Sequence, residues 1–238
     1  HAECVTALCE LDADRDSRNI LGYTPLRYAA LERSFDAMQA LLETGDVDIN
    51  ARLLGLTETA LDVAVRLGDV DGAKLLLWHR ADFTTPDSYG HTPLHKAALH
   101  NKPGMVDLLV EMGANVRARG STDEKTPLHM AAEVRAVSAA RSLLLHGADV
   151  NKRDVLGMSP LHRAAFVSEN DQAAEMIELL LEWGADEKAV DHRGRTPAQA
   201  VPAANNPTVL GLLARIHGDR AWQRRRLVVM CRSRLRKE

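Results

Sequence analysis

Aromatic residues are scarce in this chain of 238 residues, since Phe, Trp and Tyr together make up 4% of it. A single thick core usually relies on such bulky rings, so the 45% hydrophobic content must pack as thin aliphatic layers. The three cysteines, Cys4, Cys9 and Cys231, are an odd number without a framework, which argues against a secreted fold held by disulfides. We expect free thiols in a reducing, intracellular compartment, either the cytoplasm or the nucleus.

Membrane-spanning and export signals are also lacking. No stretch approaches the roughly 18 to 20 uncharged apolar residues that are needed to span a bilayer. Residues 1–20 hold several acidic side chains and no cationic start followed by an apolar run, so they do not resemble a secretory signal. Because the chain begins with His1 rather than Met, we expect a processed chain or a piece of a longer one.

One short phrase recurs at nearly constant spacing. Its first residues are Thr24, Thr59, Thr92, Thr126, Ser159 and Thr196, at intervals of 35, 33, 34, 33 and 37 residues. Thr or Ser caps a helix start, Pro suits the first helical position, and a following Ala-Ala pair lets neighbouring helices approach closely. A Leu-rich run and usually a Gly then mark a second helix and its end. The sequence therefore predicts six helix-turn-helix units over residues 19–218, separated by turns of the type Asp-x-x-Gly.

Three of these phrases, Thr92–Ala98, Thr126–Ala132 and Ser159–Ala165, read Thr/Ser-Pro-Leu-His-x-Ala-Ala. They resemble the ankyrin-repeat family, whose period is about 33 residues. The resemblance implies an all-α ankyrin-repeat solenoid, with two antiparallel helices per repeat and a turn or β-hairpin that projects at right angles. Residues 1–18 look like a partial N-terminal repeat, and residues 219–238 form a separate basic tail that we expect to be helical.

Several units depart from the family pattern. Ala60 and Asp62 replace Pro and His in the second unit. Glu124 stands where Gly is usual, which predicts a distorted fourth turn. Residues 167–172 lengthen the bend between the helices of the fifth unit, and residues 202–207 contain prolines and asparagines that interrupt the sixth. Atypical terminal repeats are expected, because one of their faces meets water.

His95, His129 and His162 occur once per unit and invite a search for a metal site. Zinc ligands usually come in pairs roughly two to five residues apart, whereas these histidines are 34 and 33 residues apart and belong to different layers. The family resemblance implies that they hold the helix start by hydrogen bonds. No nucleophile elbow, phosphate-binding glycine loop or HExxH pair is present. We therefore expect no metal, no cofactor and no enzymatic activity.

Protein binding is the function that the resemblance implies. Partners of ankyrin arrays usually lie along the projecting turns and the inner face of the first helices, and aromatic, Arg and Met side chains are enriched at such interfaces. The predicted contact residues are Tyr23, Tyr28, Tyr89, His91, Lys96, His100, Met130, Met158, Arg163, Phe166, Arg193 and Arg195. A wider set of turn residues free of the repeat pattern includes Ile20, Leu21, Val155 and Leu156.

The expected function is thus that of a monomeric scaffold or adaptor that binds another protein on its concave face. An alternative is a substrate-recruiting segment of a larger enzyme or channel. The tail keeps further interpretations open, because residues 220–238 carry a net charge of +7 and residues 1–219 one of −10. It could cover the last repeat, dock on an acidic protein or an anionic membrane, or contact nucleic acid.

The docking candidates of the tail are Trp222, Arg224, Arg225 and Arg226. Nucleic acid is the least favoured partner, because Trp222 is the only aromatic residue of the tail that could stack on a base.

Overall fold

The chain is described by a computed structural model that covers residues 7, 13–52, 58–166 and 171–200. Its helices are α2 (Pro25–Leu31), α3 (Phe35–Glu43), α4 (Ala60–Leu67), α5 (Val70–Trp78), α6 (Pro93–Leu99), α7 (Pro103–Glu111), α8 (Pro127–Val134), α9 (Val137–Leu145), α10 (Pro160–Phe166), α11 (Asp171–Glu182) and α12 (Pro197–Ala200). Within these ranges there is no β-strand, so the projecting segments that lie in them are turns rather than β-hairpins.

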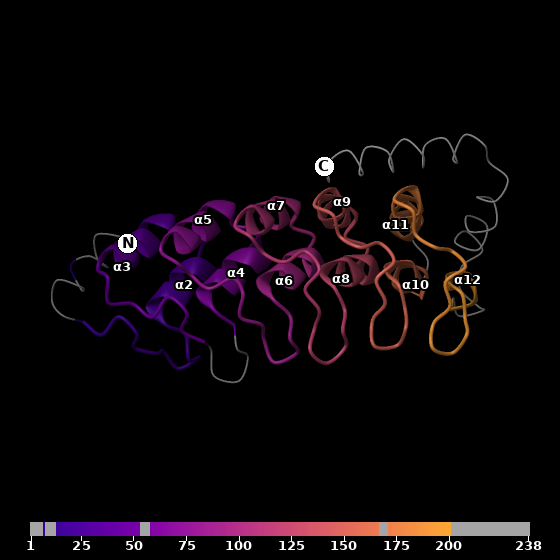
Figure 1. The fold of residues 1–238 in the computed structure, drawn as a ribbon. Coiled ribbons are helices and arrows are strands. Elements are labelled where there is room, and N and C mark those ends of the chain that lie inside the picture. Colours follow the sequence, from indigo (N-terminus) through magenta and orange to yellow (C-terminus); the bar gives the residue numbers. More distant parts are fainter. Residues whose placement is uncertain (1–6, 8–12, 53–57, 167–170, 201–238) are drawn as a thin grey trace.

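The helices stack in two rows (Figure 1). The inner row consists of α2, α4, α6, α8, α10 and α12, and the outer row of α3, α5, α7, α9 and α11. Each inner helix from α2 to α10 packs on the next inner helix and on the outer helix of its own unit, as α6 does on α8 and α7. The described turns project from the inner row, away from the outer row. The expected layers of paired helices are therefore present, and we call the side with the turns and the open face of the inner helices the inner side.

Small side chains let the inner helices approach one another. Ala30, Ala98, Ala132 and Ala165 stand at the same place in four units, and none of them is exposed to solvent. The helix starts are capped as expected, for example by Thr24, whose hydroxyl accepts a hydrogen bond from the backbone N–H of Arg27 at 3.3 Å. Local capping and close Ala packing together account for helices of at most eight residues in this row.

The outer row supplies the larger apolar side chains. One leucine recurs in each outer helix at the same place in the unit, and every copy is buried: Leu41, Leu76, Leu109, Leu143 and Leu180. A single unit could not cover its own leucine, so each unit is stabilised by its neighbours. The resulting core is a long thin sheet of aliphatic contacts, as the shortage of aromatic residues predicts.

Two positions with a positive φ, one after a helix and one in a turn, carry a non-glycine residue where the other described units carry glycine. Arg80 adopts a φ of +68° after α5, at the place that Gly147 occupies with a φ of +84° after α9. In the fourth turn, Glu124 adopts a φ of +53°. There the N–H of Gly120 donates to the carbonyl of Lys125 at 2.9 Å, which makes this turn one residue longer than the others and explains the distortion expected from the sequence.

Backbone hydrogen bonds join neighbouring turns. The N–H of Ser121 donates to the carbonyl of Tyr89, and the N–H of His192 to that of Leu156, both at 3.0 Å. The close approach explains Gly157, because a Cβ on this residue would lie 2.9 Å from the backbone nitrogen of His192 and its φ is +74°. The third to the sixth turn are therefore held in a row, with each one registered against the next.

Some expectations fall outside the described residues. They concern most of the partial repeat at residues 1–18, the interruptions at residues 202–207, the rest of the sixth unit, and the whole of the basic tail with Trp222, Arg224, Arg225 and Arg226. Within the described ranges, no helix is both long and apolar enough to cross a membrane.

Two adjacent leucines of α9 test the layered core. Leu144 is 2% exposed and Leu145 is 46% exposed. Leu144→Ala should lower the free energy of unfolding by about 2 to 5 kcal/mol, because it leaves a cavity between units. Leu145→Ala, with the same loss of atoms, should lower it by less than about 1 kcal/mol. Urea unfolding followed by circular dichroism measures both, and equal costs would contradict the assigned packing.

Candidate functional site

Histidines tie the start of one inner helix to the backbone of the next unit. The Nδ1 atom of His95 accepts the N–H of Thr92 at 3.1 Å, so the ring proton of the neutral side chain lies on Nε2. This N–H donates to the carbonyl of Lys125, one residue before the next helix cap, at 3.1 Å. His129 repeats the arrangement with Thr126 and with the carbonyl of Met158, both at 3.1 Å.

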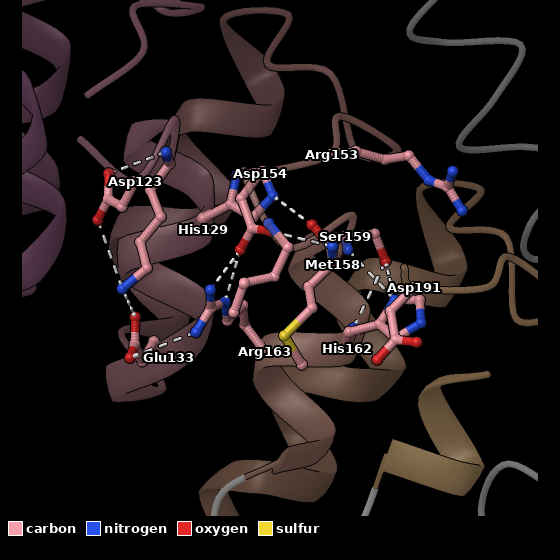
Figure 2. Close-up of polar contacts among 12 residues, drawn as sticks. Asp123, His129, Glu133, Arg153, Asp154, Met158, Ser159, His162, Arg163 and Asp191 are labelled. Carbon is pink, nitrogen blue, oxygen red and sulfur yellow. Dashed lines mark hydrogen bonds and ion pairs between the residues drawn. The ribbon is translucent and has the colours of Figure 1, made fainter. Parts of the chain in front are cut away.

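His162 makes the same pair of bonds, to the N–H of Ser159 at 3.2 Å and to the carbonyl of Arg195 at 3.0 Å (Figure 2). Burial lowers the pKa of His95 and His129 from 6.5 to about 4, and it also lowers the pKa of His162. These side chains are therefore neutral at physiological pH, and both ring nitrogens already contact backbone groups. This geometry supports the structural role that the family resemblance implies and leaves no nitrogen free for a metal.

Charged residues replace this histidine in the first two units. Arg27 occupies the equivalent place in α2, and its guanidinium pairs with the carboxylate of Glu58, the residue before the cap of α4. In α4, Asp62 accepts the N–H of Thr59 at 3.0 Å and places its other oxygen 3.0 Å from Nζ of Lys96. Ion pairs thus connect these units where a ring N–H connects the later ones. The departure at Asp62 was expected from the sequence, but Arg27 was missed, although its position in the repeated phrase was a sufficient signal.

A chain of ion pairs continues along the inner side (Figure 2). Lys125 lies 2.7 Å from Glu133 and 3.6 Å from Asp123, measured from Nζ to the carboxylate oxygens. Arg163 donates through Nε to the buried carboxylate of Asp154 at 2.8 Å and also faces Glu133 at 4.0 Å. Each of these cations is largely covered, so the network stabilises the units before any partner arrives.

Three of the predicted contact residues are cations that already form ion pairs within the chain. Lys96 is held between Asp62 and Asp87, Arg163 by Asp154, and Arg195 by Asp191 at 2.8 Å. Burial raises the pKa of Asp191, but hydrogen bonds from Arg195 and from the Arg193 N–H outweigh it and lower the pKa to about 2. A partner that used these cations would first have to separate them from charged carboxylates, which is costly.

Four other predicted residues are covered to different degrees. Met130 and Met158 are buried, so neither side chain is available to a partner in this conformation. His91 is half-buried and stacks between Tyr89 and His95, with ring centroids 6.0 and 5.3 Å away. Tyr23 is half-buried under the guanidinium of Arg27, whose Cζ lies 4.1 Å from the ring centroid.

The remaining predicted residues are open to solvent. The exposed members are Tyr28, Tyr89, His100, Phe166 and Arg193. Desolvation and the positive charges of Arg66 and Lys102 lower the pKa of His100. Tyr89 stands on the third turn and is 62% exposed, whereas Tyr28 and Phe166 lie on α2 and α10. The structure therefore places the free aromatic candidates on the inner side but in different units.

Exposed apolar side chains also lie at turn tips and on the outer row. Ile20 and Leu21 in the first turn, and Val155 and Leu156 in the fifth, are exposed. Trp78, at the end of α5, is 85% exposed and was not singled out from the sequence, because the repeat places no requirement on that position. It belongs to the outer row and is therefore remote from the turns.

A Ser, an Asp and a His meet between α7 and α9, but not in a catalytic arrangement. One oxygen of Asp107 accepts from the hydroxyl of the buried Ser142 and lies 2.9 Å from Nε2 of His146. Nucleophilic catalysis needs the base between the hydroxyl and the carboxylate. Here the carboxylate lies between the other two groups, so the cluster is a polar link between outer helices.

Comparison with known proteins agrees with this geometry. Residues 61–154 and 118–191 match a family model for ankyrin repeats in three copies, and residues 28–77 match one for ankyrin repeats in many copies. The chain belongs to the ankyrin-repeat family. Ankyrin repeats are generally protein–protein interaction modules, and members of the family are typically non-catalytic scaffolds.

Individual ankyrin-repeat relatives cover large parts of the chain. Inversin of Mus musculus is 32% identical over 207 residues, which is 84% of this chain and 19% of inversin. Ankyrin repeat and SOCS box protein 6 of Homo sapiens is 41% identical over 147 residues, which is 60% of this chain and 34% of that protein. The chain thus spans about a fifth to a third of the length of these two relatives.

A solved structure confirms the predicted all-α ankyrin solenoid. The ankyrin repeat domain of Bcl-3 superposes with a TM-score of 0.71 and 25% sequence identity, covering 90% of this chain and 91% of that domain.

The histidine links predict an acid-sensitive fold. Because burial lowers the pKa of His129 in the folded chain, the unfolded chain takes up a proton first, and stability is lost as the pH falls from 6.5 towards 4. His129→Gln keeps an acceptor for the helix start, as Gln199 shows by accepting the N–H of Thr196 at 2.9 Å, but it does not titrate. Between about pH 7 and about pH 4.5, the variant should lose about 2 kcal/mol less unfolding free energy than the parent chain.

Urea unfolding at each pH measures this difference. His192→Gln is the matched control, because His192 is exposed at a turn tip and its loss should leave the pH dependence as it is in the parent chain. An unchanged pH dependence in His129→Gln would contradict the neutral histidine link.

Proposed function

We propose that the chain is a scaffold or adaptor that captures a partner protein on its inner side. The observation that carries this proposal is the exposure of Tyr89 on a turn whose backbone is hydrogen-bonded to the next turn. Tyr28 and Phe166 add exposed rings on inner helices of other units. Large aromatic side chains on a rigid frame contribute strongly to interfaces, because burying them costs little conformational entropy.

The ion pairs within the chain also favour the exposed side chains of the inner side as the binding surface. Lys96, Arg163 and Arg195 fix the inner helices and turns through carboxylates of their own chain. The side chains left for a partner are therefore the exposed ones, namely Tyr28, Tyr89, His100, Phe166 and Arg193. A stiff array of this kind would present them at fixed separations, so that a partner spanning several units could contact them together.

An alternative proposal is that the array recruits substrates for a longer protein that carries an enzyme or a channel elsewhere. It is favoured by the small share of the relatives that the chain spans, 19% for inversin of Mus musculus. In either case we propose an intracellular location, the cytoplasm or the nucleus, and action as a monomer. Docking through the basic tail at residues 219–238 remains a separate proposal that concerns an acidic surface or an anionic membrane.

A pair of double variants tests the inner side. Tyr28→Ala with Tyr89→Ala should weaken binding of a partner isolated with the parent chain about tenfold or more, because both rings are lost from the contact surface. The thermal midpoint should change by less than about 2 °C, since both side chains are exposed. Quantitative pull-down and differential scanning calorimetry measure the two effects.

Trp78→Ala with Leu145→Ala is the matched control, because it removes two exposed apolar side chains from the ends of outer helices. The control should bind like the parent chain. Loss of binding in the control and not in the tyrosine variant would place the interface on the outer row and overturn the proposal.

A further inference from the structure

The fifth turn presents an apolar tip that its own backbone holds rigidly. Val155 and Leu156 are 45% and 54% exposed. The carboxylate of Asp154 accepts the N–H of Leu156 at 2.9 Å and that of Met158 at 3.0 Å, so the tip is fixed from inside the turn. The carbonyl of Leu156 in turn accepts the N–H of His192 from the sixth turn at 3.0 Å. Two neighbouring aliphatic side chains thus face solvent from a preorganised position.

The turns that carry and adjoin this tip also contribute two arginines that pair with no carboxylate of the described residues. Arg193 is exposed on the sixth turn, and its guanidinium has no hydrogen-bond or ion-pair partner in the described part of the chain. The guanidinium of Arg153 donates to the carbonyl of Val190, a neutral group that leaves its charge unpaired. We call Arg153, Val155, Leu156 and Arg193 the fifth-turn patch.

The buried carboxylates of the fifth and sixth turns do not neutralise the fifth-turn patch. Asp154 is buried and paired with Arg163, and Asp191 is buried and paired with Arg195. Both acids also accept backbone N–H groups of their own turns. Each is therefore already matched by a cation of its own, and Arg153 and Arg193, which pair with no carboxylate among the described residues, leave a local excess of positive charge.

Other described turns do not combine these features. The third turn exposes Tyr89 beside the neutral Ser88, and its acid, Asp87, faces Lys96 at 3.8 Å. The first turn exposes Ile20 and Leu21, but the Arg18 guanidinium there is shared between the carbonyls of Gly22 and Arg52. An exposed aliphatic pair beside an arginine without any partner is found, among the described turns, at the junction of the fifth and sixth.

We infer that the fifth-turn patch binds a peptide segment of a partner protein in which carboxylate side chains stand next to aliphatic or aromatic ones. The inference rests on the proposed function and names the chemistry of its partner. Aliphatic tips gain by burial against apolar side chains, and guanidinium groups pair with carboxylates in a defined geometry. Single-stranded nucleic acid fits less well, because the patch contains no aromatic ring on which a base could stack. The chain's own basic tail would be repelled.

Selection from a random peptide library identifies the ligand chemistry directly. A library of peptides of about twelve residues is selected on the full chain, and the enriched sequences are compared with the input. We expect enrichment of peptides with net negative charge and two or more apolar residues. Enriched peptides that are neutral or basic on average would overturn the inference, and so would the absence of enrichment.

Point variants then place the best selected peptide on the patch. Arg193→Glu and Leu156→Ser should each weaken its binding about tenfold, measured by fluorescence anisotropy with the labelled peptide. Arg141→Glu, which reverses an exposed charge on the outer helix α9, is the matched control and should change binding less than about twofold. Equal weakening by Arg141→Glu and Arg193→Glu would show a general charge effect and overturn the inference.

Two further experiments distinguish an acidic peptide from nucleic acid as the ligand, and this inference from the proposed function. A single-stranded DNA of about twenty nucleotides should not displace the peptide at physiological salt, and displacement would favour nucleic acid instead. A partner protein whose capture is lost in the Tyr28/Tyr89 double variant but kept in Arg193→Glu would overturn this inference alone. Capture that both variants retain would overturn the proposed function as well.

Discussion

The hydrogen bond from a buried histidine to the carbonyl before the next helix start is the contact on which the rest of this structure depends. In His129 the ring completes the cap of α8 with one nitrogen and reaches Met158 of the following unit with the other. Because both partners are backbone groups, the bond fixes the register of two units whatever side chains their surfaces carry. Because the units are in register, their turns are aligned as well, and the backbone N–H of His192 can donate to the carbonyl of Leu156. A thin core of alanines and leucines gives attraction between units but little direction, so the directional part must come from such polar links.

Ion pairs take over this task where the histidine is missing, and they decide which surface is left for a partner. Arg27 reaches Glu58, and Asp62 faces Lys96, at the two junctions that lack the ring. Buried pairs of this kind fix geometry well but add little net stability, because each charge gives up its hydration. Once these cations are paired, affinity for a partner must come from side chains outside the network. Exposed tyrosines, the aliphatic fifth-turn tip and the unpaired Arg193 are such side chains.

The fold could be predicted almost entirely from the sequence, because capping, period and apolar pattern all indicate the same helices. Thr92, Pro93 and the Ala97–Ala98 pair specify a helix start and a close contact with no reference to distant residues. The surface could be predicted only in part. Met130 and Arg163 stand at equivalent places in α8 and α10 and were both expected to face a partner, yet one is buried and the other is paired with Asp154. The burial of Met130 and the pairing of Arg163 depend on the length of the neighbouring turns and on which carboxylate these turns bring close. Neither property can be predicted from the repeated phrase alone. The role of Arg27 was missed because it becomes clear only when its position in the first unit is compared with that of His95 in the third.

The histidine links and the fifth-turn patch share residues, which couples folding to binding at the C-terminal units. The carbonyl of Arg195 accepts from His162, and the guanidinium of the same residue neutralises Asp191. Asp191 in turn holds the N–H groups of Arg193 and Arg195, so one buried carboxylate shapes the turn that carries the free arginine. Protonation of His162 would place a proton on Nδ1, which could then no longer accept the N–H of Ser159. The helix start that orients the ring toward the carbonyl of Arg195 would lose its cap. A ligand seated across the fifth and sixth turns would favour the joined arrangement over the separated one, because it contacts both turns only when they are in register. The same histidine bond therefore governs both the layering of the units and the alignment of the surface that we propose for a partner.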